Sequence, residues 1–503
     1  MSRFLRNSVF GTLAGLSTTL GNFLSGLVVS RLLGVEPAGS VAFAVWAVWL
    51  GTTVVNGGLP FTLARYLPEV GARDGDAVAQ QLAARLLRPF AAVAVLPALG
   101  GLGYAAWLIH GQVGDATSPF RDPVICALIG ANITTQALGD FARSVLRGRH
   151  AFDAVARTTA TMATLQIVAL LVGAGLFGTR GAVAAYWLAS WVPLVVLREV
   201  WGPTGPPQRA VLGRMRRYAR FRWASDILGF LVWSRIEILF LQLAWGLGSV
   251  GLFSAGMTLA NLAVQGPLML TWALMPRFAE LHGQHDRDSM LRLYATGTRL
   301  LAFLVFPASF GLAAVLPSLL PLLYGQAFAG AIPAAQVLVC AASLAAISSV
   351  GSNLVWGLER SDADFYASLA GAALALVGGV VLIRPFGDMG AAASRALTQA
   401  CAVGISSWFL WARLGFAIPV GALLRLFGAA LLCGGVARGV LALHPGVLGL
   451  AVAIPSGAIT YVAAVRLFGA LTADDTARLH GLVAALPWPI ARRADPWARL
   501  ILG

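Results

Sequence analysis

The sequence predicts an all-α protein that crosses a membrane many times. Of its 503 residues, 58% are hydrophobic and 11% are charged, and the mean hydropathy is +0.78. A soluble domain carries about 25% charged residues, so this composition is that of a membrane protein. At roughly 35 residues for each membrane helix and its connection, the length corresponds to about 14 spans.

Apolar runs of sufficient length occur along nearly the whole chain. The first run is too long for the core of a signal peptide, so we expect a retained helix. Four cysteines lie inside such runs without metal-ligand spacing, which indicates packing residues. The expected spans are residues 8–33, 39–64, 87–110, 122–142, 158–178, 181–197, 223–246, 250–275, 298–322, 331–357, 365–385, 389–411, 418–442 and 446–467.

All 36 basic residues are arginines, and their distribution predicts the orientation of the chain. Because the nucleotide-binding P-loop needs a lysine, an ATP-driven pump in this chain is excluded. Loops on one side hold 29 arginines and those on the other side hold 5. By the positive-inside rule, both termini are expected in the cytoplasm. The net charge of +15 then reflects orientation, and we expect no nucleic acid partner.

An internal repeat relates the two halves of the chain. At an offset of 212, residues 33–39 fall on residues 245–251 and Arg65 falls on Arg277, and at an offset of 209, residues 178–181 fall on 387–390. Because each half has an even number of spans, we expect parallel repeats related by an axis along the membrane normal. The predicted organisation is an N-terminal six-helix bundle (1–201), a basic interfacial linker (202–222), a second six-helix bundle (223–413), two extra spans (414–470) and a cytoplasmic amphipathic tail (471–503).

The linker and the tail both combine arginines with apolar residues. Six arginines between residues 209 and 222 alternate with Val211, Leu212, Met215, Tyr218 and Phe221. This pattern is typical of helices that lie at the membrane surface, so we expect both segments at the inner leaflet.

Several motifs together resemble one family of membrane proteins. They are residues 31–34 (RLLG), residues 57–69 (GGLPFTLARYLPE), residues 147–149 (RGR), residues 246–254 (GLGSVGLFS) and residues 322–328 (LLYGQAF). In this order and spacing they resemble the bacterial polysaccharide flippases, which handle lipid-linked oligosaccharides within the multidrug/oligosaccharidyl-lipid/polysaccharide exporter superfamily. The resemblance implies alternating access by two six-helix bundles and transfer of an undecaprenyl-diphosphate-linked sugar to the outer leaflet.

Polar residues at membrane depth are the candidate site. In the first span, Thr18, Asn22 and Ser25 share one helical face. We expect Thr18 and Ser25 to pack against other helices and Asn22 to line the cavity. Near the cytoplasmic end of the fourth span, Asp140 and Arg143 are expected to form a salt bridge.

The seventh span carries charges on opposite faces. Asp226 and Glu237 share one face, whereas Arg235 lies nearly opposite Glu237, because two residues turn a helix by about 200°. At offset 212 Glu237 falls on Ser25, which favours Glu237 as the residue facing the cavity. Asp226 and Glu237 are candidates for coupling to a proton or sodium ion, or are structural.

Arg395 and Gln399 share a face of the twelfth span. We expect either Arg235 or Arg395 to contact the diphosphate and the other to be structural. The predicted substrate-binding residues are therefore Arg235, Arg395, Asn22, Glu237 and Gln399. The expected partners are the lipid-linked saccharide, membrane lipids, and a polymerase with other assembly proteins.

Two related functions are weighed against this one. Drug antiporters of the superfamily generally have an acid in the first span, and this span has none. For a lipid II flippase the resemblance would lead one to expect several arginines along the first span, which holds Arg31 alone, near its outer end. No catalytic arrangement stands out and no cofactor or metal is expected, so an enzyme is a poor alternative.

Overall fold

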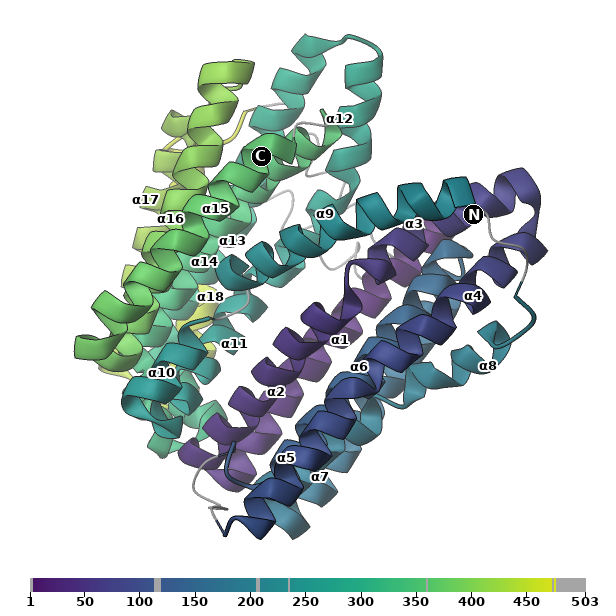
Figure 1. Cartoon of the computed structure of the whole chain (residues 1–503). Coiled ribbons are helices and arrows are strands. Elements are labelled where there is room, and N and C mark those ends of the chain that lie inside the picture. Colours follow the sequence, from purple (N-terminus) through teal and green to yellow (C-terminus); the bar gives the residue numbers. More distant parts are fainter. Residues whose placement is uncertain are drawn as a thin grey trace. The chain divides into compact units, whose positions relative to one another are not determined.

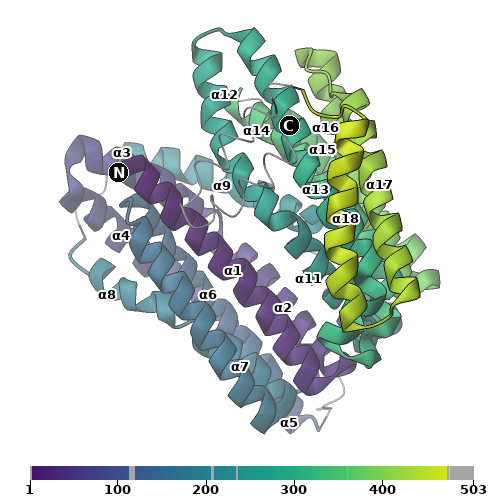
Figure 2. The ribbon, with the colours of Figure 1, turned by 180° about the vertical axis from the view of Figure 1, so that it is seen from behind.

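The secondary structure is helical throughout the part of the chain that the structure describes. The computed structural model describes residues 3–112, 119–204, 209–233, 236–358, 361–472 and 475, and these hold no strand. Figures 1 and 2 show the helices from opposite sides. The predicted all-α class is confirmed. Arg235 and most of the predicted tail, residues 476–503, lie outside the described residues.

The helices follow one another with short connections. From the N-terminus to residue 245 they are α1 (Arg3–Leu33), α2 (Val35–Asn56), α3 (Leu59–Asp74), α4 (Asp76–Ala94), α5 (Leu96–His110), α6 (Pro123–Gly148), α7 (Phe152–Ala189), η1 (Val192–Val196), α8 (Leu197–Val200), α9 (Arg209–Trp233) and α10 (Glu237–Trp245). The remaining helices are α11 (Leu247–Met269), η2 (Leu270–Ala273), α12 (Leu274–Gly283), α13 (Arg287–Tyr324), η3 (Gln326–Ala331), α14 (Ile332–Gly357), α15 (Ser361–Gly378), η4 (Gly379–Ile383), α16 (Arg384–Leu414), α17 (Val420–Leu443) and α18 (Val447–Leu467).

These helices account for the expected membrane spans. Among the described residues, ten helical stretches are long and apolar enough to cross a membrane. Two of them, residues 152–200 and 366–414, each hold two expected spans, because the chain reverses inside them. The first expected span coincides with α1 and the seventh coincides with α9 and α10, and these helices are not among the ten. The protein is therefore a multi-pass membrane protein.

Both chain reversals have the same geometry. Gly178 (φ 59°, ψ −137°) and Gly387 (φ 56°, ψ −133°) occupy a region of backbone space that favours glycine. A Cβ at Gly181 would lie 1.9 Å from the carbonyl oxygen of Gly173, eight residues away. Eight residues of straight helix span about 12 Å, so this contact requires a hairpin. At offset 209 the same contact recurs, because a Cβ at Gly390 would lie 2.0 Å from the carbonyl oxygen of Leu382.

The turns that open α2 and α11 also match. Gly34 (φ 84°, ψ −170°) and Gly246 (φ 80°, ψ −171°) precede these helices and have nearly identical backbone angles. The offset of 212 predicted from the sequence therefore relates two turns of the same shape. Together with the hairpins, this agreement confirms the internal repeat.

The starts of α2 and α11 cross at backbone distance. A Cβ at Gly39 would lie 1.8 Å from the carbonyl oxygen of Leu247, and a Cβ at Gly251 would lie 2.3 Å from the carbonyl oxygen of Val35. Val35 and Leu247 are themselves repeat partners, so the contact is reciprocal. The two glycines therefore play equivalent parts in one close backbone contact.

The chain divides into two compact units. The first comprises Met1–Thr258 and Ala375–Ala391, and the second comprises Leu259–Leu374 and Ala392–Gly503. In the first unit, α1 packs along α7 and α5 packs along α6. In the second unit, α13 packs against α14 and α17, and α17 packs along α18. The predicted division into two bundles, a linker, two extra spans and a tail stays a prediction.

An ion pair ties the segment after α18 to α13. The Asp475 carboxylate is fully buried and accepts hydrogen bonds from Nε and Nη2 of Arg299, at 2.8 and 3.0 Å, and from Oγ1 of Thr472, at 2.8 Å. Burial alone would raise the pKa of Asp475, but these hydrogen bonds lower it below its ordinary value. The stabilisation is therefore present above the unfolded-state pKa and is lost as the pH falls through the lower folded-state value.

We expect Gly39→Ala and Gly251→Ala each to lower the melting temperature of the purified protein. The added Cβ would meet backbone atoms of the crossing helix, which cannot move aside as a side chain can. Overpacking of this kind costs about 1–3 kcal/mol.

Gly404→Ala in α16 is the matched control for a thermal-unfolding measurement in detergent. Nothing lies within 4 Å of a Cβ at Gly404, and Ala favours a helix over Gly. An unchanged melting temperature in the Gly39 and Gly251 variants would contradict the close crossing.

Candidate functional site

The polar residues of α1 divide into a buried and an exposed set. Ser25 is fully buried, and its Oγ accepts a hydrogen bond from Nε2 of Gln166 in α7 at 2.7 Å. Ser25 therefore has the packing role that the sequence suggested. Thr18 and Asn22, one turn apart, lie on the exposed side of the helix. Of the predicted first-span residues, Asn22 thus presents an amide on the surface of the first unit.

The two acids of the seventh span differ in their surroundings. Asp226 in α9 pairs with Arg222, one turn earlier, at 2.7 Å between Nη2 and Oδ1. The Arg222 guanidinium lies 3.8 Å from the ring centroid of Phe61, which holds the pair against α3. This arrangement favours a structural role for Asp226. Glu237 begins α10 and is 1% exposed.

A polar network joins α2 to α6. Arg143 pairs with Asp140 at 2.6 Å, as the sequence predicts. Asp140 also accepts a hydrogen bond from Nδ2 of Asn56 at 2.9 Å, and Gln136 Oε1 lies 3.5 Å from Arg143 Nη2. Asn56, which lies 84 positions from Asp140, was not among the residues predicted from the sequence, although its place at the end of an apolar run was a signal.

In the second unit, α16 carries a buried polar strip. Arg395 is 3% exposed and Gln399 is 7% exposed, and the two lie one turn apart. Ser394 and Thr398 are also buried and repeat the same spacing. The strip therefore comprises two pairs at i and i+4, on one side of the helix. Sequence analysis found one of these pairs, and the other was visible in the same spacing.

Helix α9 uses its apolar face for packing within the first unit. Val211 and Met215 belong to the core of that unit, and Nε1 of Trp223 donates to the carbonyl oxygen of Val54 at 3.1 Å. A Cβ at Gly58 would lie 2.3 Å from the carbonyl oxygen of Ala219, so the turn before α3 also touches α9. Figure 1 shows α9 lying across α2 and α3. The buried apolar side chains of α9 are therefore unavailable for insertion into lipid.

Family models match two overlapping parts of the chain. Residues 120–333 match the model described as polysaccharide biosynthesis protein, and residues 257–455 match the model of the lipid II flippase MurJ. No curated protein sequence matches the chain.

Solved structures with the same fold cover most of the chain. The lipid II flippase MurJ in an inward closed conformation is 11% identical, with a TM-score of 0.72 over 92% of this chain and 98% of that chain. An inward-facing multidrug resistance transporter of the MATE family is 17% identical, with a TM-score of 0.64 over 81% and 96%. A transporter of the same superfamily from Pyrococcus furiosus is 17% identical, with a TM-score of 0.55 over 84% and 96%.

The two family models together cover residues 120–455, and two of these three structures are described as transporters of the MOP superfamily. The families and structures that match the chain are described as polysaccharide biosynthesis, flippase and transporter proteins. At these identities the solved structures establish the exporter fold.

We expect Asp140→Asn to destabilise the protein, because it removes the charge that faces Arg143. The two side chains are 33% and 15% exposed, and loss of a charged hydrogen bond at such a site costs about 1–3 kcal/mol. Thermal unfolding at fixed pH measures the difference.

Asp153→Asn removes the same charge from an exposed pair with Arg157, whose side chains are 49% and 76% exposed. Exposed pairs contribute about 0–1 kcal/mol, so this control should leave the melting temperature nearly unchanged. Equal losses in the two variants would show that the network around Asp140 adds no stability of its own.

Proposed function

We propose that this protein is a flippase that moves undecaprenyl-diphosphate-linked oligosaccharide from the inner to the outer leaflet by alternating access. The observation that carries the proposal is the buried guanidinium of Arg395 in a membrane-spanning helix. Burying a charge in a membrane helix is costly, so ionisable residues within such helices usually serve transport. A diphosphate is the part of the substrate that needs a cation.

The neighbours of Arg395 on α16 suit the rest of the head group. Gln399, one turn away, offers an amide, and Ser394 and Thr398 offer hydroxyl groups. Guanidinium groups bind phosphate oxygens in pairs of parallel hydrogen bonds, and amides and hydroxyls recognise sugar hydroxyls. The match of residues 120–333 to polysaccharide biosynthesis proteins supports the same substrate class.

The first unit contributes the remaining proposed site residues. Asn22 is proposed to contact the head group from the exposed side of α1. Arg235 stays the alternative to Arg395 as diphosphate ligand. Glu237 is proposed as a site of coupling to a proton or sodium ion, and the ion pair with Arg222 makes Asp226 the weaker candidate.

A lipid II flippase is the second candidate function. Residues 257–455 match the MurJ family model, and the MurJ structure covers 92% of the chain. Against it stands the sequence of α1, in which Arg31 is the one arginine beyond the first six residues. Multidrug extrusion is disfavoured because α1 contains no acid.

The proposed setting is the bacterial cytoplasmic membrane, with both termini in the cytoplasm. There the protein would serve synthesis of O-antigen, capsule or exopolysaccharide. A polymerase and other assembly proteins would take up the translocated product.

Deletion of the gene in its own host tests the function. The flippase proposal predicts loss of surface polysaccharide and accumulation of undecaprenyl-diphosphate-linked glycan, which mass spectrometry of extracted lipids detects. Accumulation of lipid II with cell lysis would instead support a lipid II flippase. Sensitivity to drugs with normal surface polysaccharide would support multidrug extrusion.

Variants of Arg395 test the site in cells that depend on the protein. Arg395→Gln should lower surface polysaccharide by about tenfold or more at equal membrane abundance, because the charge is lost. Arg395→Lys should retain more export, because it keeps the charge while losing the paired hydrogen bonds.

Arg384→Gln is the matched control, since Arg384 is an exposed arginine of the same helix. Normal export by Arg395→Gln would show that the diphosphate is held elsewhere.

A further inference from the structure

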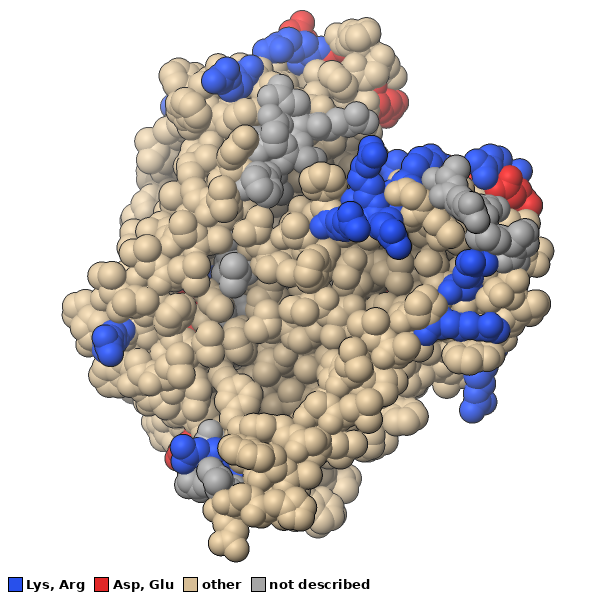
Figure 3. Space-filling model, in the orientation of Figure 1, with Lys and Arg blue, Asp and Glu red and all other residues tan. Residues whose placement is uncertain are grey.

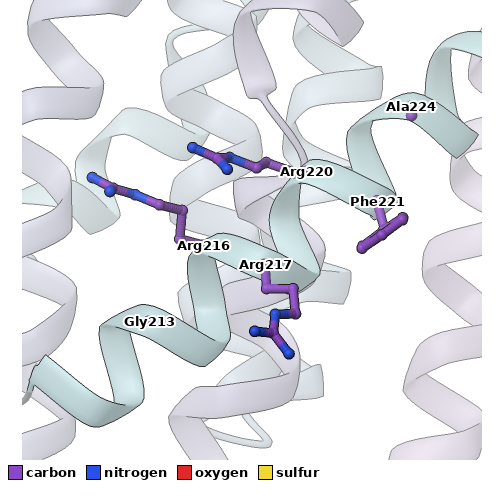
Figure 4. A pocket seen from close by; sticks show the side chains of 6 residues that line it. All are labelled: Gly213, Arg216, Arg217, Arg220, Phe221 and Ala224. Carbon is purple, nitrogen blue, oxygen red and sulfur yellow. The ribbon is translucent and has the colours of Figure 1, made fainter.

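One face of α9 is exposed and strongly basic. Gly213, Arg216, Arg217, Arg220, Phe221 and Ala224 line a hollow of about 480 Å³. Their spacing of three or four residues places them in one stripe along the helix. Figure 4 shows Arg216 and Arg220 extending in the same direction from α9, whereas Arg217 and Phe221 extend in other directions.

The arginines of this stripe differ from others on the same helix. Arg214 pairs with Glu69 at 2.7 Å, and Arg222 pairs with Asp226 at 2.7 Å. Among the described side chains, no acid forms an ion pair with Arg216, Arg217 or Arg220. Figure 3 shows basic side chains gathered over α9. Like charges three and four residues apart repel one another, so an anion bound between them would stabilise this face.

The opposite face of α9 fixes the stripe in place. Val211 and Met215 attach this face of the helix to the core of the first unit. Because these apolar side chains pack against the rest of the first unit, α9 is held in place. The arginines extend from the exposed face of the helix. A site on a rigid element positions its charges more precisely than a loop does.

The stripe also has an apolar member. Phe221 is 74% exposed and lies between the arginines and Ala224. Gly213 and Ala224, which flank the charged turn, leave space beside the helix. The surface therefore combines three closely spaced cations with an apolar ring. A lipid with a compact, highly charged head group has the complementary chemistry.

We propose that Arg216, Arg217, Arg220 and Phe221 bind the diphosphate of a polyprenyl lipid at the cytoplasmic end of the protein. The guanidinium groups pair with oxygens of the two phosphates, and Phe221 contacts the first isoprene units. This site lies outside the membrane-depth residues of the proposed transport pathway and provides the first contact with the substrate. The inference rests on the proposed function, because it assumes a diphosphate-linked lipid.

Binding of undecaprenyl diphosphate to the full-length protein in nanodiscs of neutral lipid tests the inference. The test variant is Arg216→Gln with Arg217→Gln and Arg220→Gln. We expect its affinity to fall about tenfold or more, and the corresponding triple Lys variant to lose less. Inorganic pyrophosphate should compete with the lipid, whereas phosphatidylglycerol at the same concentration should compete weakly, because it carries one phosphate.

The control removes three exposed arginines that have acidic partners. Arg73, Arg157 and Arg277 pair with Asp74, Asp153 and Glu280, and their side chains are 57%, 76% and 53% exposed. Replacing all three by Gln lowers the net charge equally and should leave binding unchanged. A stable melting temperature in all variants excludes loss of folding as the cause.

Other results would overturn the inference in distinct ways. Equal competition by phosphatidylglycerol would identify the stripe as a surface for bulk anionic lipid. Unchanged binding in the triple Gln variant, with surface polysaccharide still lost on gene deletion, would refute this site and leave the proposed function standing. Absence of binding by the unaltered protein, with normal polysaccharide after deletion, would refute both.

Discussion

The crossing of α2 and α11 constrains the arrangement of the helices around it. The carbonyl oxygen of Leu247 occupies the place of a side chain at Gly39, so the two backbones touch directly. Apolar burial gives little drive for helix association in lipid, and close packing at small residues replaces it. Because Gly34 and Gly246 join α1 and α10 to the crossing helices, the same contact fixes where those helices end. Asn22 lies in α1 and Glu237 begins α10, so each belongs to a helix that ends at this crossing.

Charges in this fold are handled in two ways. Toward the ends of helices, arginines pair with acids at short distance, as Arg143 does with Asp140 and Arg222 does with Asp226. Within α16, Arg395 is buried in one strip with Ser394, Thr398 and Gln399. Polar neighbours of this kind lower the cost of a buried charge.

The spans and the repeat were predictable from the sequence because both are local properties. Apolar length sets a span, and the glycines at 178 and 387 mark the hairpins wherever the rest of the chain lies. Contacts between distant segments were not predictable in this way. The offset aligned Gly39 with Gly251 but did not indicate that they touch, and no pattern linked Ser25 to Gln166, 141 positions away. Similarly, amphipathicity predicted that α9 has an apolar face, but not that protein rather than lipid covers it.

The basic stripe of α9 breaks the symmetry that the glycine crossing preserves. At the offset of 212, Arg216, Arg217 and Arg220 fall on Phe4, Leu5 and Ser8, so the first repeat carries no equal of this surface. A fused duplication lets the two copies diverge, which a dimer of identical chains cannot do. The glycine turns and the reciprocal glycine contact recur at the offset, whereas the basic stripe lies in the predicted linker, which belongs to neither bundle. A symmetric dimer would display such a surface twice, whereas this chain carries these three arginines once, with no counterparts at the offset of 212.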